Sequence, residues 1–106
     1  MRRSTEKKSE AMKLLEELSG GLPTFGEMIR TVRECEEWTL DRCARKLGVT
    51  RAYLCDIEKG RRGVSVARAA RWARVLGYSE GQFVELALQE QIDSAGLKYR
   101  IGVEAA

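Results

Sequence analysis

Small polar residues and glycines divide this sequence into short segments, and their spacing constrains the fold more than any other feature. A Ser or Thr stands before each of five segments whose apolar residues recur every three or four positions, namely Thr24, Thr39, Thr50, Ser65 and Ser79. These residues are preferred helix N-caps, because their side-chain oxygen accepts a hydrogen bond from a backbone N–H of the first turn. Glycine follows four of the segments, at Gly48, Gly60, Gly77 and Gly96, and glycine readily takes the left-handed conformation that ends a helix. The sequence therefore predicts an all-α fold with five helices.

Each end of the chain adds one further predicted element. Ser9 can cap a short amphipathic helix that carries apolar residues over 12–18 and stops at Gly20. Residues 97–104 alternate between apolar and polar, and a period of two predicts one short β-strand. We therefore expect five helices with an extra N-terminal helix and a short C-terminal strand.

The composition excludes several classes of protein. A chain of 106 residues is enough for one domain with one core. It has no histidine, so the commonest general base and the Cys/His zinc patterns are missing, and we expect no enzyme, no metal and no cofactor. The three cysteines are odd in number and irregularly spaced, which favours free thiols in a reducing compartment. No apolar stretch approaches the ~20 residues of a membrane span and no secretory signal is present, so we expect a cytoplasmic protein without a membrane partner.

Positive charge is concentrated in the middle of the chain. Residues 42–74 hold ten Lys and Arg against two acids, Asp56 and Glu58, a net charge of +8. Residues 79–106 hold two cations against five acids, a net charge of −3. A basic stretch inside a nearly neutral chain indicates a polyanionic partner. Within it Arg68, Arg71 and Arg74 recur every three residues, as is also typical of a solvent-exposed helix face.

The segment 40–59 has the spacing of a helix-turn-helix. Two short helices that cross steeply around a three-residue turn need a small residue in the first helix, here Ala44, and a residue tolerant of positive φ in the turn, here Gly48. Thr50 caps the second helix. Apolar residues must fill the angle between the helices, and they stand at Cys43, Leu47, Val49, Leu54 and Ile57.

At these positions the sequence resembles the Xre family, which contains the Cro proteins and phage repressors. The resemblance runs over residues 25–76 and includes IRTVRE, TLDRCARKLGVTRAYLCDIEKGRRG and SVARAARWARVLG, with IEKG (57–60) as the family's turn after its recognition helix. It implies a Cro/repressor-like domain that binds double-stranded DNA as a homodimer. Leu40 departs from the family, whose members often carry a phosphate-contacting glutamine there, so Thr39 is the candidate for that contact. We divide the chain into a tail with a short amphipathic helix (1–23), the helix-turn-helix domain (24–77), and a C-terminal helix and strand for dimerisation or partner binding (78–106).

Helical spacing and the resemblance together predict the DNA-contacting residues. Leu54 and Ile57 point inward, so the outward face of the recognition helix carries Arg51, Ala52, Cys55, Asp56 and Lys59. The resemblance implies base contacts at Arg51, Ala52 and Asp56, with Tyr53 at the edge of this face, suited to a phosphate or a methyl group. Arg51 suits guanine, Ala52 a thymine methyl, and Asp56 either accepts from cytosine or orients Arg51. We expect phosphate contacts from Thr39, Thr50, Lys59, Arg61 and Arg62. Glu58 is expected to bond within the protein.

The last helix carries more apolar surface than one packing face needs. One stripe consists of Phe83, Leu86 and Ala87, and a second can face a partner subunit. The predicted strand has no partner within the chain, so it can pair with its twin across a dimer axis. The predicted dimerisation residues are Val84, Leu88, Ile92, Tyr99 and Ile101.

Three functions fit these features. The first is a transcriptional repressor that binds a palindromic operator as a homodimer and is nucleoid-associated when bound to DNA. The second is an antitoxin that represses its own operon and neutralises a toxin protein through a terminal segment. The third, a helical protein-binding module without a DNA target, is disfavoured by the +8 segment and by the outward position of Arg51.

Overall fold

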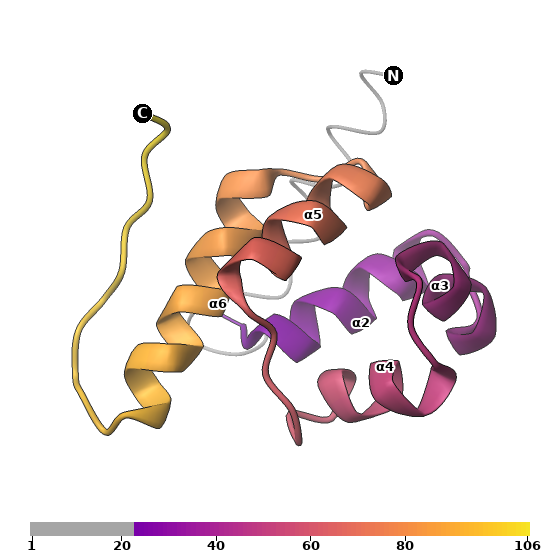
Figure 1. Cartoon of the computed structure of the whole chain (residues 1–106), viewed down its shortest axis with the longest axis horizontal. Helices are drawn as coiled ribbons and strands as arrows, with labels where there is room; N and C mark the ends of the chain where they lie inside the picture. Colours follow the sequence, from indigo (N-terminus) through magenta and orange to yellow (C-terminus); the bar gives the residue numbers. More distant parts are fainter. Residues whose placement is uncertain (1–22) are drawn as a thin grey trace.

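Five α-helices make up the part of the chain that the structure, a computed structural model, describes, residues 23–106. They are α2 (Phe25–Cys35), α3 (Leu40–Leu47), α4 (Arg51–Glu58), α5 (Val66–Leu76) and α6 (Glu80–Ser94) (Figure 1). The helix expected around residues 12–18 lies outside the described residues. No described helix is long and apolar enough to cross a membrane.

The predicted caps define the helix boundaries. The side chain of each predicted N-cap, Thr24, Thr39, Thr50, Ser65 and Ser79, accepts a hydrogen bond from the backbone N–H three residues further on. Two of the helices end on glycines in the left-handed region, Gly48 with a φ of 73° and Gly77 with a φ of 78°. Because each of these contacts spans a few residues, the sequence predicts the helix boundaries well.

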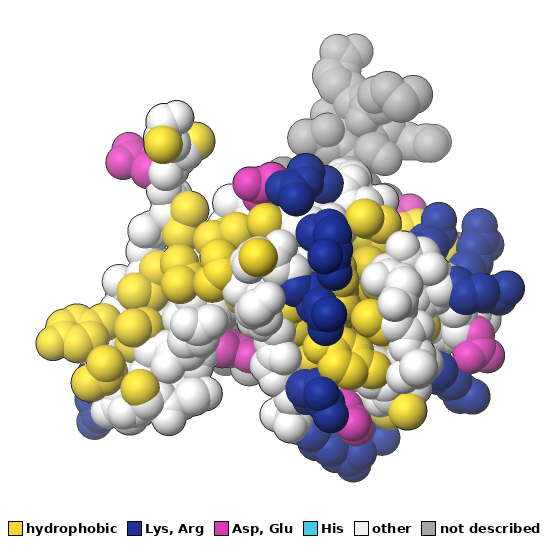
Figure 2. Space-filling model, viewed as in Figure 1, with side chains coloured by type: hydrophobic (Ala, Val, Ile, Leu, Met, Phe, Trp, Pro, Cys, Tyr) yellow, Lys and Arg dark blue, Asp and Glu magenta, His cyan; other side chains and the backbone are white. Residues whose placement is uncertain are grey.

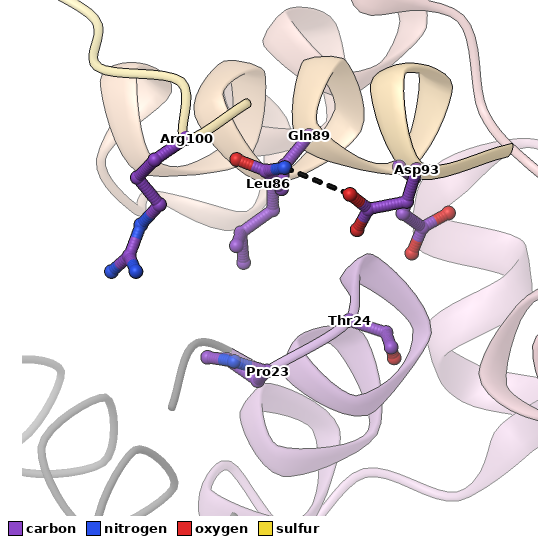
Figure 3. Close-up of a pocket in the computed structure, with 7 residues that line it drawn as sticks. Pro23, Thr24, Leu86, Gln89, Asp93 and Arg100 are labelled. Atoms are coloured by element: carbon purple, nitrogen blue, oxygen red, sulfur yellow. Dashed lines mark hydrogen bonds between the residues drawn. The ribbon is translucent and has the colours of Figure 1, made fainter. Parts of the chain in front are cut away.

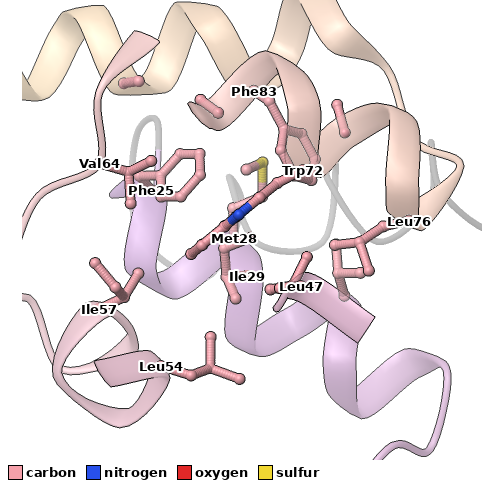
Figure 4. Close-up of a cluster of buried hydrophobic side chains, with 14 of the residues drawn as sticks. Phe25, Met28, Ile29, Leu47, Leu54, Ile57, Val64, Trp72, Leu76 and Phe83 are labelled. Atoms are coloured by element: carbon pink, nitrogen blue, oxygen red, sulfur yellow. The ribbon is translucent and has the colours of Figure 1, made fainter. Parts of the chain in front are cut away.

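Large apolar side chains from all five helices form one core (Figure 4). Trp72 of α5 is fully buried, and Phe25 packs edge-to-face on Phe83 with ring centroids 5.7 Å apart. Cys43 is also fully buried, and this burial raises the pKa of its thiol to about 11. The core position expected for Cys43 is therefore confirmed.

The helix-turn-helix and the C-terminal part of the chain lie at opposite ends of the molecule. α5 packs most extensively on α6, while α2 contacts both α6 and α4. Figure 1 shows α3 and α4 at one end of the molecule and α6 with the C-terminal tail at the other. The helix-turn-helix thus lies away from the surface expected to form the dimer.

The predicted C-terminal β-strand is wrong, because residues 97–106 form no regular secondary structure. The tail instead attaches to α6 through one side-chain amide: Gln89 Nε2 donates to the Tyr99 carbonyl oxygen at 2.7 Å, and the Ile101 N–H donates to Gln89 Oε1 at 2.8 Å. The Gln89 carboxamide thus provides one donor group and one acceptor, no more than a single peptide group of a neighbouring strand would provide. A strand needs a ladder of such bonds along its length, and the described part of the chain provides no neighbouring strand.

The start of α2 is attached to both ends of the molecule. The Phe25 N–H donates to Glu90 Oε2 at 2.6 Å, so a carboxylate of α6 caps the first turn of α2. Beside this contact lies a cavity of about 220 Å³ between α2, α6 and the tail, with Arg100 extending over it (Figure 3). On the α4 side, Gly26 lies so close to the Ile57 and Glu58 carbonyl oxygens that a β-carbon would collide with them.

Candidate nucleic-acid interface

The turn between α3 and α4 has the geometry that its sequence predicts. Gly48 is in the left-handed region, and the Val49 N–H donates to the Ala44 carbonyl oxygen at 3.0 Å, which closes the end of α3. Ala44 is buried and Val49 packs against the core. Residues 48–50 are thus the three-residue turn of a helix-turn-helix.

α4 is held from its inner side by the core and by an ion pair. Leu54 and Ile57 are buried, as expected. Arg33 of α2 donates from Nε and Nη2 to the two carboxylate oxygens of Glu58, at 2.8 and 3.0 Å, and from Nη1 to the Trp38 carbonyl oxygen at 3.2 Å. The hydrogen bonds to Glu58 raise the pKa of Arg33 above its ordinary value. The prediction that Glu58 bonds within the protein is confirmed.

The outward face of α4 presents Arg51 and Ala52 to solvent. Arg51 is 66% exposed, and its Nε lies 4.0 Å from Oδ1 of Asp41 in α3. Asp56 is half-buried and accepts from Arg61 Nη1 at 3.4 Å. Asp56 therefore pairs with Arg61 and not with Arg51, the side chain that it was expected to orient if it did not accept from cytosine.

Tyr53 is enclosed by two arginines. The Arg68 Nη1 donates to the Tyr53 hydroxyl at 2.6 Å, and the Arg62 and Arg68 guanidinium carbons lie 4.9 and 5.4 Å from the ring centroid. Sequence reasoning did not predict the contribution of Arg68, which is fifteen residues from Tyr53. One signal was available: Arg68 stands in the first turn of α5, where the helix dipole disfavours a cation.

The predicted phosphate-contacting residues all lie at the surface. Thr39 and Thr50 are exposed, and each hydroxyl accepts a backbone N–H of the helix that it caps, which leaves its own proton free to donate. The first-turn N–H groups of α3 and α4 point away from these helices and favour an anion. Lys59, Arg61 and Arg62 are exposed at the end of α4 and in the loop that follows. Figure 2 shows Lys and Arg side chains around the end of the molecule formed by α3 and α4.

A groove of about 350 Å³ runs along this surface between α2, α3 and α4. Its lining adds Arg30 of α2 to the predicted cations Arg51 and Lys59. Sequence reasoning did not single out Arg30, because only the packing of α2 on α4 brings it there. Cys55, predicted to lie on the outward face of α4, also lines the groove and is half-buried.

The predicted dimerisation residues lie on α6 and the tail. Val84, Leu88 and Ile92 are half-buried and recur every four residues along one side of α6. Figure 2 shows hydrophobic side chains at the surface of the end of the molecule formed by α6 and the tail. Tyr99 is 66% exposed, and Ile101 is half-buried beside Gln89. The structure thus brings these positions to one side of the molecule although the strand is not formed.

Residues 24–86, more than half of the chain, match a family described as a helix-turn-helix domain. The chain belongs to this helix-turn-helix family. The match covers α2 to α5 and the first half of α6, and it agrees with the resemblance to Xre and Cro proteins. No curated protein and no solved structure matches the chain in the other comparisons.

Proposed function

We propose that this helix-turn-helix protein is a transcriptional repressor that binds a palindromic DNA operator as a homodimer. The observation that carries the proposal is the position of α4. Its inner face is held by the core and by the ion pair of Glu58 with Arg33 of α2, while Arg51 and Ala52 on its outer face are exposed. Base edges in the major groove are read by side chains that project from such a firmly held helix.

The charge around α4 supports the proposal. Arg30, Lys59 and Arg61 surround the outward face, and the N-termini of α3 and α4 add backbone donors. Phosphate contacts of this kind supply affinity and fix the register, while contacts to base edges supply specificity. We assign Arg51, Ala52, Tyr53 and Asp56 to the bases.

Two recognition helices are needed because one alone reads too few base pairs for useful specificity. We place the contact between the two subunits on Val84, Leu88 and Ile92 of α6, with Tyr99 and Ile101 of the tail beside them. Half-sites about 34 Å apart, one helical turn, would each accept one α4. Bound in this way, the dimer would exclude RNA polymerase from an overlapping promoter.

Binding to duplex fragments from the region upstream of the gene, measured across a salt series, tests this function. We expect two subunits per site on one palindrome, and an affinity that falls steeply as salt rises. Leu88→Glu should halve the number of subunits and weaken binding. Gln82→Glu, the same charge change at an exposed position of α6, should not. Weak binding that ignores sequence would contradict the repressor.

An antitoxin that represses its own operon is the second candidate. The tail favours it, because Leu97 and Tyr99 are 47% and 66% exposed on a segment attached by few hydrogen bonds. Exposed apolar side chains on a loosely held segment suit a protein partner. Expression together with the neighbouring reading frames would yield a stable complex if the protein is an antitoxin, and the protein by itself if it is a repressor alone.

A further inference from the structure

Arginine side chains form a row that leads from the loop after α4 along the exposed side of α5 (Figure 2). We call Arg62, Arg68, Arg71 and Arg74 the α5 arginine row. α5 itself contains no acidic residue. Arginines three residues apart on a helix rise by about 4.5 Å at each step, so their positive charges lie close together.

The row starts at the recognition helix. Arg62 and Arg68 lie against the ring of Tyr53, and Arg68 also donates to the Tyr53 hydroxyl. These contacts restrict two flexible side chains at the edge of the DNA-reading face. The row is therefore continuous with the surface that the proposed function assigns to DNA.

The far end of the row is more exposed. Arg74 donates to Glu80 Oε1 at 2.8 Å, with 62% of the Arg74 side chain accessible. Arg71 is exposed and makes no ion pair or hydrogen bond with any residue of the described part of the chain. Like charges three residues apart disfavour a helix, and Arg68 in the first turn opposes the helix dipole. Tyr53 and Glu80 offset part of these costs at Arg68 and Arg74. Arg71 has no such contact in the described part of the chain, whereas an anion outside the protein would offset its charge.

We propose that the α5 arginine row binds DNA backbone phosphates that lie beyond the half-site read by α4. This proposal rests on the proposed function, because the row extends the same surface. DNA phosphates fit better than an acidic protein, since the row begins at the DNA-reading face and its charges follow one another at short, regular intervals. The duplex would then be contacted on two adjoining surfaces, and the affinity would depend on the length of its flanks.

The test uses two duplexes of mixed sequence, one of about two helical turns and one of about four, with the full chain and a salt series. Because each phosphate contact contributes about 0.9 to the slope of log affinity against log salt, the slope should be steeper on the longer duplex. Arg71→Ala should lower that slope by about 0.9 on the longer duplex and leave the shorter one unchanged. Arg71→Lys, which keeps the charge, should restore the slope.

Two matched variants control for changes that are unrelated to the row. Arg100→Ala removes one positive charge from the tail beside α6, and Val75→Ala changes an apolar side chain, 52% exposed, four residues from Arg71. Neither should change the slope on either duplex. An equal loss of slope with Val75→Ala and with Arg71→Ala would show that the slope responds to any change on this side of α5 and not to the charge of Arg71, and it would overturn the proposal.

The remaining outcomes separate the two proposals. Salt-dependent binding with the same slope for Arg71→Ala and the wild type on the longer duplex overturns the role of the row alone. An equal loss of slope for Arg71→Ala on both duplexes would place Arg71 within the half-site, and this result would also overturn the proposed role of the row. If the wild type binds neither duplex, the proposed DNA-binding function fails together with the row.

Discussion

Arg33 of α2 and Glu58 at the end of α4 form an ion pair with two hydrogen bonds, of 2.8 and 3.0 Å. Only 15% and 6% of the two side chains are exposed. The guanidinium also binds the Trp38 carbonyl oxygen, so three of its donor hydrogens have partners. This pair connects the inner side of the recognition helix to α2.

Removing one partner of the pair should destabilise the fold. Glu58→Ala leaves the guanidinium of Arg33 largely buried without its counter-charge, and we expect the free energy of unfolding to fall by about 3 kcal/mol. Urea denaturation measures this loss. The double variant Arg33→Met/Glu58→Leu, which replaces both charges by apolar groups, should regain most of the stability. A loss below about 1 kcal/mol for Glu58→Ala, the range of exposed pairs, would show that the pair is worth no more than a surface contact.

Gly26 should tolerate no side chain. A methyl group there would collide with the Ile57 and Glu58 carbonyl oxygens, and backbone atoms cannot move aside without shifting α4. We expect Gly26→Ala to cost about 3 kcal/mol, at the upper end of overpacking effects. Gly81→Ala is the matched control, because its nearest neighbour, Ser79 Oγ, would be 3.9 Å from the new β-carbon. This control should be neutral or stabilising by up to about 1 kcal/mol, and equal losses in both variants would refute the close-approach argument.

Glu90 should make stability depend on pH. Burial raises its pKa above the ordinary value of 4.5, although the backbone N–H groups of Phe25 and Gly26 act in the opposite direction. A raised pKa means that the folded state binds the proton more tightly than the unfolded state does. The contribution of Glu90 to stability is therefore present below pH 4.5 and declines as the pH rises through the folded pKa.

Glu90→Gln removes this titration and keeps an oxygen that can accept from the Phe25 N–H. Relative to the wild type, the variant should gain stability as the pH rises from about 4 to about 7, which urea denaturation at several pH values measures. Glu104→Gln, at an exposed position of the tail, controls for the loss of one carboxylate. If the difference in unfolding free energy between Glu90→Gln and the wild type stayed constant with pH or changed in the opposite direction, burial of the charged carboxylate would not be the dominant influence on the pKa of Glu90.

Arg51 and Arg61 should affect DNA binding differently. Arg51 projects from the outward face of α4 and Arg61 follows the end of that helix. Arg51→Ala should cost roughly 1–3 kcal/mol of binding free energy and relax specificity at one base pair, because a guanine contact is lost. Arg61→Ala should weaken binding to all sequences by a similar factor, because a phosphate contact is lost. Binding to a set of single-base operator variants distinguishes them, and sequence-independent losses in both would remove Arg51 from the base contacts.

The sequence by itself determined the five described helices, their boundaries and the helix-turn-helix. Each N-cap hydrogen bond spans three residues, as between Thr50 and the Tyr53 N–H, and the turn at Gly48 needs only a local positive φ. Interactions of this kind depend only on residues that are close in the sequence, so the spacing of capping residues and glycines predicts them. The inward positions of Leu54 and Ile57 followed in the same way from helical periodicity.

The tertiary structure alone decided which distant groups meet. The partners in Arg33–Glu58, Tyr53–Arg68 and the cap of Glu90 on Phe25 are 25, 15 and 65 residues apart. No local pattern selects one cation among nineteen Lys and Arg as the partner of a given acid. The C-terminal strand was wrongly predicted for the same reason. A period of two shows which side chains could alternate on a strand, but a strand forms only where a second strand completes its hydrogen bonds, and the packing of the chain decides whether one is there.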